Sequence, residues 1–209
     1  MKAVCTVLCL GLLSVCGAAP LTTCDQLITT GDRGVDFSGR WYLHALSTDS
    51  CVLSSVWHTF LKPSLALDVV YQETQKSYEV VTTIKIQTAC ENDTRSYIFD
   101  NTSFTLSHEE ESYHLLPSDC TDCIIWKIES FYKAIFLYSR KTTIDPADLK
   151  EFETRAACLG LPKPRVVDTD YDFGHCKDFE EEEHGIFLQR MKDSVVEMIE
   201  CVVKYVSNL

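Results

Sequence analysis

Two groups of side chains in this sequence have types and spacings that could support chemistry, the cysteines and the histidines. Cys120 and Cys123 form a Cys-x-x-Cys pair, a spacing used by redox-active thiols and by structural disulfides. The six histidines show no metal-type spacing with one another, and neither a Gly-x-Ser-x-Gly motif nor a phosphate-binding loop occurs. The sequence therefore predicts a non-enzymatic protein without a resident metal or cofactor.

The N-terminal segment, residues 1–19, has the pattern of a secretory signal peptide. Lys2 supplies positive charge, residues 3–15 form an apolar run, and Gly17, Ala18 and Ala19 provide the small residues that precede cleavage. The run is too short to span a bilayer, and no later segment offers about 18 consecutive apolar residues. We therefore expect a secreted, extracellular protein with no transmembrane segment.

Removal of this segment changes the cysteine count from odd to even. The whole chain has 11 cysteines, of which Cys5, Cys9 and Cys16 precede the expected cleavage site. An even set in an oxidising compartment favours a disulfide framework, although sequence alone cannot pair its members. The mature set consists of Cys24, Cys51, Cys90, Cys120, Cys123, Cys158, Cys176 and Cys201.

Composition and short motifs restrict the partners. The chain has 19 basic and 31 acidic residues and a formal net charge of -12, and no basic stretch is interleaved with aromatic residues. This balance argues against a nucleic-acid partner, because binding to phosphates needs clustered Lys and Arg. Asn92 and Asn101 each begin an Asn-x-Ser/Thr sequon, which predicts glycosylation of a secreted chain.

Residues 39–140 form a series of short segments in which apolar and polar side chains alternate, as in strands with one buried face. Several such strands joined by short turns predict an antiparallel sheet that closes or folds over a shared interior. The side chains expected to face that interior are Leu67, Val69, Tyr71, Tyr78, Val80, Thr82, Ile84, Tyr97, Phe99, Tyr113, Leu115, Trp126, Ile128, Phe136 and Tyr138.

The pattern changes at about residue 143. An N-cap region with Pro146 near the first helical position precedes apolar side chains at helical spacing, and Gly160 and Pro162 end the helix. A short strand follows at 165–167. After an acidic stretch, residues 185–206 predict an amphipathic helix, which either docks on the barrel or contacts a partner, a second copy or a lipid surface.

Three short motifs occur in order along the strand region. Gly39 and Trp41 form a Gly-x-Trp pattern, Asp122 lies in a Thr-Asp-Cys turn, and Arg140 ends the last strand. Together they resemble the signature motifs of lipocalins, in which Tyr stands at the position of Cys123. The resemblance implies an all-β fold, an eight-stranded antiparallel up-and-down β-barrel with one α-helix packed outside. It also implies that Arg140 lies over Trp41 in a cation–π contact.

The expected lipocalin domain spans residues 20–176. Its last third resembles the orosomucoid (alpha-1-acid glycoprotein) branch of that family. Apolipoprotein M and the fish plasma proteins that bind saxitoxin, tetrodotoxin or tributyltin are similar there. This resemblance implies disulfides between Cys24 and Cys158 and between Cys90 and Cys176.

Four cysteines and residues 177–209, the acidic stretch plus the C-terminal amphipathic helix, have no counterpart in the orosomucoid pattern. Because the extra helix and the extra cysteines occur together, we expect Cys201 to tie the helix to the barrel through one of the other three. Cys51, in the loop after the first strand, is the preferred partner, which leaves Cys120 with Cys123.

The resemblance implies a plasma carrier or scavenger that binds a small hydrophobic or amphipathic ligand inside the barrel without a covalent step. A lipid, a steroid, a drug, a toxin and an organotin all remain candidate ligands. The alternative is a glycosylated interaction or immunomodulatory protein that engages a receptor, a lipoprotein or a second copy through its surface and C-terminal helix. The expected ligand contacts are Leu67, Val69, Tyr78, Val80, Thr82, Ile84, Tyr97, Phe99, Tyr113, Trp126, Phe136 and Tyr138.

Overall fold

The computed structural model describes residues 23–30, 36–55, 57, 62–100, 102–106, 112–167, 170–176, 195–196, 199–201 and 203. The signal peptide, Asn101 and most of the C-terminal helix lie outside the described residues, so the predictions for them stay predictions. The described residues comprise the barrel and the segments attached to it.

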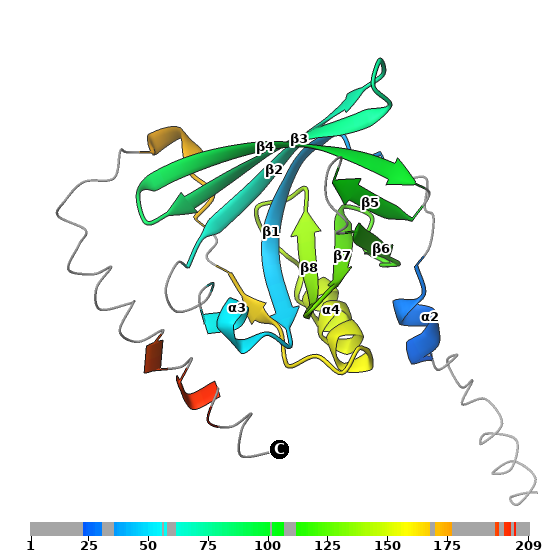
Figure 1. Ribbon diagram of the computed structural model, residues 1–209, viewed down its shortest axis with the longest axis vertical. Helices are drawn as coiled ribbons and strands as arrows, with labels where there is room; N and C mark the ends of the chain where they lie inside the picture. Colours follow the sequence, from blue (N-terminus) through cyan, green and yellow to red (C-terminus); the bar gives the residue numbers. More distant parts are fainter. Residues whose placement is uncertain are drawn as a thin grey trace, which may run out of the picture.

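Eight strands form a closed antiparallel barrel (Figure 1), because β1 pairs with both β8 and β2 while each other strand pairs with its neighbours in sequence. The predicted eight-stranded up-and-down barrel is therefore confirmed. A ninth strand, β9 (Arg165–Val166), pairs with β1 outside the closed ring. The barrel strands are β1 (Gly39–Thr48), β2 (Ser64–Gln72), β3 (Ser77–Ile86), β4 (Ala89–Asp100), β5 (Ser103–Leu106), β6 (Ser112–Leu116), β7 (Cys123–Glu129) and β8 (Lys133–Ser139).

The predicted outer helix is α4 (Pro146–Cys158), which lies against the outside of the barrel in Figure 1. Asp145 caps it by accepting a hydrogen bond from the Ala147 backbone amide at 2.8 Å. Phe152 and Ala156 are fully buried against the outward-facing apolar side chains of the barrel. Within the part of the chain that the structure describes, no helix is both long and apolar enough to cross a bilayer.

Alternation along β7 explains how the barrel supports two cores. Ile124, Trp126 and Ile128 point inward and join the core inside the barrel, whereas Ile125 belongs to the outer core beneath α4. Because both faces of the strand are covered, only Lys127 and Glu129 near its end reach solvent. The outer core thus fixes α4, and the inner core surrounds the candidate site.

The expectation for Tyr71 is wrong, because this side chain is 44% exposed. The pairing of β1 with β2 ends where Gly39 pairs with Val69, so β2 and β3 continue past the closed ring as a hairpin. Tyr71 lies in that extension, and its ring packs against Tyr78 at a centroid distance of 5.0 Å. Strand parity predicted the face of the residue but not where the barrel ends.

Disulfides attach the segments outside the barrel at several points. Three short helices that the sequence patterns did not predict, α2 (Cys24–Ile28), α3 (Cys51–Ser55) and η2 (Phe173–His175), lie at or beside bonded cysteines. The structure joins the eight described cysteines in the expected pairs, Cys24–Cys158, Cys51–Cys201, Cys90–Cys176 and Cys120–Cys123.

Candidate functional site

One end of the barrel is closed by the residues of the first and third motifs. The guanidinium carbon of Arg140 lies 4.1 Å from the centre of the Trp41 ring, which is the cation–π contact expected from the sequence. Arg140 also donates hydrogen bonds to the carbonyl oxygens of Ser38 at 2.9 Å and Asp36 at 2.7 Å. Trp41 Nε1 donates to the Phe37 carbonyl at 2.8 Å. These bonds hold the chain before β1 across the end of the barrel.

Gly39 is required by this arrangement for two reasons. Its φ angle is +102°, a backbone conformation that residues with a side chain rarely adopt. A Cβ atom on Gly39 would lie 2.8 Å from Nη1 of Arg140. The glycine of the Gly-x-Trp motif therefore leaves room for the guanidinium group.

A cavity of about 310 Å³ lies inside the barrel. This volume is at the lower end of the range of about 300–1,000 Å³ for small-molecule sites. Its lining comes from every strand of the barrel and from the segments around it: Phe37, Trp41, Leu53, Trp57, Leu65, Leu67, Val69, Val80, Thr82, Tyr97, Phe104, Tyr113, Ile124, Trp126, Ile128, Tyr132, Phe136 and Tyr138.

The end of the barrel opposite Arg140, which we call the mouth, is lined by residues from outside the strands. Leu53 comes from α3 in the connection between β1 and β2, and Tyr132 comes from the turn between β7 and β8. The first residue of α3, Cys51, is bonded to Cys201 near the C-terminus. The C-terminal segment is thus covalently attached to an element that contributes to the cavity wall.

Aromatic side chains form most of the wall, ten of the eighteen lining residues, so ring faces and edges dominate what a ligand would meet. Phe104 makes edge-to-face contacts with Phe37 and Trp126, each at a centroid distance of 4.8 Å. All three tryptophans of the chain, Trp41, Trp57 and Trp126, line the cavity. Their fluorescence therefore reports on its contents.

Three tyrosines from alternate strands supply polar groups to this wall. Tyr97 from β4 and Tyr113 from β6 have ring centroids 5.9 Å apart, and Tyr138 from β8 is buried. Burial raises the pKa of Tyr138 above its ordinary value of 10.0, and the nearby Tyr113 and Tyr97 add to the shift. Tyr138 therefore stays an uncharged phenol with a proton to donate.

Nine of the twelve expected ligand contacts line the cavity, namely Leu67, Val69, Val80, Thr82, Tyr97, Tyr113, Trp126, Phe136 and Tyr138. The structure places Tyr78, Ile84 and Phe99 against the inner core but outside the cavity lining. Tyr78 and Phe99 pack against the ring of Phe37, at centroid distances of 5.9 Å and 5.0 Å. Phe37 itself lines the cavity, so these two side chains support the wall through a lining residue.

The other nine lining residues were not among the expected ligand contacts. Leu53 and Trp57 come from the β1–β2 connection and Tyr132 from a turn, where period-two alternation gives no signal. Phe104 lies in a four-residue strand that is too short for a parity assignment. Strand parity does carry a signal for Leu65, Ile124 and Ile128, which continue the inward pattern of their strands, whereas Trp41 and Phe37 were interpreted from the motif alone.

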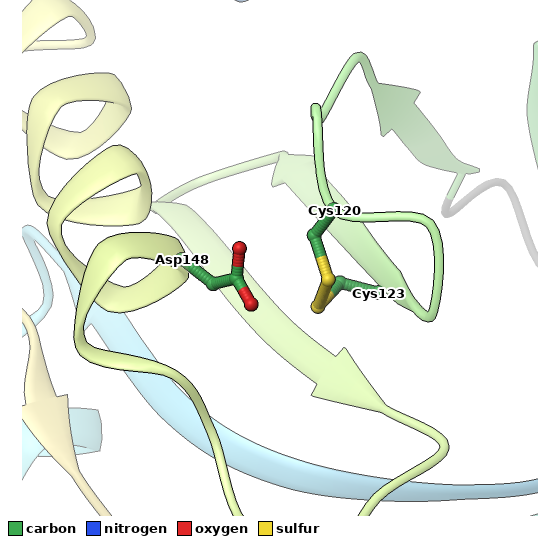
Figure 2. Close-up of side chains that lie close together, drawn as sticks. All are labelled: Cys120, Cys123 and Asp148. Atoms are coloured by element: carbon green, nitrogen blue, oxygen red, sulfur yellow. A yellow bond between two sulfur atoms is a disulfide. The ribbon is translucent and has the colours of Figure 1, made fainter.

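The Cys-x-x-Cys pair lies outside the cavity, at the start of β7 and beside α4 (Figure 2). The sulfur atoms of Cys120 and Cys123 lie within 4.8 Å of a carboxylate oxygen of Asp148. Metal ligation by cysteine needs thiolates, and the two sulfurs are bonded to each other. Burial and the charges of Asp145 and Glu151 raise the pKa of the Asp148 carboxyl. In the oxidised chain this group is a structural bridge beside a carboxyl group.

Asn92, the sequon residue that the structure describes, is exposed on β4. It pairs with Thr83 of β3 through the backbone, which places its side chain on the outside of the barrel. A glycan there would extend into solvent.

The closed eight-stranded barrel, the Gly-x-Trp motif covered by arginine at one end, the helix α4 outside and the apolar cavity inside together define the lipocalin fold. No family model and no curated protein matches the chain. Among solved structures, the chain is similar to a siderocalin, whose structure is described in the words "The Siderocalin Ex-FABP functions through dual ligand specificities". The TM-score is 0.52 and the identity 14%, over 65% of this chain and 95% of that one. At this identity the likeness concerns the fold.

Proposed function

We propose that this protein is a secreted carrier or scavenger that binds a small hydrophobic or amphipathic molecule non-covalently inside the barrel. The observation that carries the proposal is the apolar, largely aromatic cavity of about 310 Å³. The siderocalin with the similar structure is described as functioning through dual ligand specificities, which is consistent with a binding role for the same fold.

The chemistry of the wall supports binding rather than catalysis. Among the described residues that line the cavity there is no histidine, cysteine or carboxylate that could act as a nucleophile or general base. Burial of about 300 Å² of apolar ligand surface at about 25 cal/mol per Å² would give about 7.5 kcal/mol, which corresponds to micromolar affinity. No covalent step is needed for a useful carrier.

Secretion and a place near the orosomucoid branch are part of the proposal. Four disulfides are typical of an extracellular chain. The pairs Cys24–Cys158 and Cys90–Cys176 are those that the resemblance to orosomucoid implied. Plasma as the compartment rests on that resemblance.

The test is native mass spectrometry of the mature protein secreted by expressing cells, followed by titration with lipophilic compounds while tryptophan fluorescence is recorded. We expect a co-purified or added compound to bind with one-to-one stoichiometry and to change the emission, because all three tryptophans line the cavity. A panel of lipids, steroids, basic drugs, toxins and organotins that leaves mass and emission unchanged would contradict the carrier function.

A second candidate function, contact with a protein or lipid partner through the C-terminal segment, is favoured by one observation. Val195, Val196, Ile199 and Val203 are all exposed, and their spacing places them on one side of a helix. Light scattering of the mature protein, alone and with lipoprotein particles, tests this candidate. A monomer that does not associate with the particles argues against it.

A further inference from the structure

The part of the cavity wall that the structure describes carries no charge. None of the described lining residues is Lys, Arg, His, Asp or Glu. Arg140, at the closed end, lies against the Trp41 ring and donates hydrogen bonds to two backbone carbonyls. Its charge is therefore already engaged on the far side of the ring.

This wall treats ligands of different charge differently. A carboxylate that enters it loses its hydration and finds no cation in return, which is costly. The overall negative charge of the chain adds long-range repulsion of anions. An uncharged ligand loses much less hydration and gains contact with the aromatic rings.

The polar groups of the wall suit a single uncharged function on the ligand. Thr82 contributes a hydroxyl from β3, and the phenol of Tyr138 is buried near those of Tyr97 and Tyr113. A protonated phenol donates a hydrogen bond to a hydroxyl or carbonyl oxygen and accepts one from a hydroxyl.

We propose that the cavity selects an uncharged, ring-containing ligand with a hydroxyl or carbonyl group that bonds to Tyr138, and that it rejects carboxylates. This inference rests on the proposed function and names the class of ligand that the same site takes. A fatty acid whose ionised head enters the cavity is thereby disfavoured, since the carboxylate would lose its hydration against an uncharged aromatic wall.

The test uses four probes of one ring size: naphthalene, naphthol, naphthoate and a trimethylammonium-substituted naphthalene, titrated at neutral pH against tryptophan fluorescence and by calorimetry. We expect naphthol to bind most tightly. The affinity for naphthoate should be lower than that for naphthol by a factor of about ten or more. Equal or tighter binding of naphthoate, or tighter binding of the trimethylammonium probe, would overturn the selection for an uncharged ligand. Failure of all four probes, with a steroid alcohol as a larger neutral probe, would instead contradict the carrier function.

A pair of matched variants assigns the hydrogen bond. Tyr138→Phe should lower the affinity for naphthol by about threefold to tenfold and leave the affinity for naphthalene unchanged, because only naphthol has the hydroxyl. Tyr71→Phe, which removes the same group from an exposed position outside the cavity, should alter neither. Equal losses for naphthol and naphthalene in Tyr138→Phe would show that the ring packing changed and would contradict the assigned bond.

A gain of function provides an independent check. Thr82→Lys places a cation in the wall. It should therefore raise the affinity for naphthoate relative to that for naphthol by about tenfold. Thermal unfolding verifies that the variant is folded, and Thr82→Met, which is of similar length and uncharged, is its control. If a folded Thr82→Lys variant had the same selectivity as Thr82→Met, the charge of the wall would not determine which ligand binds.

Discussion

At the scale of single residues, His44, on the outer face of β1, makes the stability of the fold depend on pH. Its side chain is 0% exposed, Nε2 lies 2.8 Å from the carbonyl oxygen of Lys141, and its ring packs against Tyr171 at 5.6 Å. Burial lowers the pKa of His44 below its ordinary value of 6.5, although the bond to Lys141 opposes the shift. The folded chain therefore holds this imidazole neutral where the unfolded chain protonates it.

This difference predicts loss of stability in weak acid. As pH falls through about 6.5 the unfolded chain takes up a proton that the folded chain takes only at lower pH, so the free energy of unfolding decreases across that interval. His44→Gln keeps a donor for the Lys141 carbonyl but cannot take up a proton. Between pH 7 and pH 5, its denaturant midpoint should therefore fall less than that of the unmodified protein. His114, whose pKa is also lowered by burial and by Lys127, contributes to the slope that remains in this variant. Identical slopes for the two proteins would exclude His44 as the cause.

Gly39 is the residue where the closing motif is most sensitive. Gly39→Ala must hold a side chain at a φ of +102° with its Cβ 2.8 Å from Arg140 Nη1, which we expect to cost about 1–3 kcal/mol of unfolding free energy. The control is Gly174→Ala, where the nearest atom lies 3.5 Å away and φ is not in the left-handed region. Urea unfolding measures both, and equal effects at the two glycines would contradict the stated reason.

At the scale of elements, α4 is attached to the barrel mainly through its apolar face. Phe152 is 0% exposed in the outer core, so Phe152→Ala should lower the free energy of unfolding by about 3–5 kcal/mol. Phe131→Ala removes the same side chain from a turn where it is 88% exposed and should change stability by less than about 0.5 kcal/mol. A small effect at Phe152 would mean that the helix contributes little to holding the barrel together.

At the mouth of the cavity, we expect α3 and its disulfide to limit the rate at which a ligand leaves. Cys51 begins α3, Leu53 of the same helix lines the cavity, and Cys201 fixes that helix to the C-terminal segment. A Cys51→Ser/Cys201→Ser double variant should release a bound neutral probe faster in stopped-flow displacement, since α3 loses its covalent support. The control, Cys120→Ser/Cys123→Ser, opens a bridge that is remote from the mouth and should leave the release rate unchanged. If both variants released the probe equally fast, a general loss of rigidity would explain the effect.

At the scale of the whole molecule, sequence patterns predicted which strand side chains face the interior better than they predicted where the loops lie. Alternation assigned Trp126 and Phe136 to the interior, and the Gly-x-Trp motif with its partner arginine predicted how one end closes. Alternation specifies a face, however, and not the depth along the barrel, so the expectation for Tyr71 was wrong. Leu53 and Trp57 line the cavity from the described part of the β1–β2 connection, a tertiary arrangement without a local signal.

The cavity also predicts how a ligand couples to the stability of the whole barrel. A neutral probe that binds the folded chain alone adds RT ln(1 + [L]/Kd), about 2.7 kcal/mol at about 100 times Kd, which for a chain of this size raises Tm by roughly 5–10 °C. Scanning calorimetry with naphthol measures this shift, and naphthoate at the same concentration should give a smaller one.

Val80→Trp distinguishes binding in the cavity from binding to the surface. Val80 is buried and lines the cavity, so an indole at this position occupies the space that a ligand needs. We expect the variant to stay folded and to lose the naphthol-dependent rise in Tm. The control Val70→Trp changes an exposed position on β2 outside the cavity lining and should keep it. A rise that survives in Val80→Trp would place the ligand on the outside of the barrel, and the uncharged aromatic wall could not then explain its selectivity.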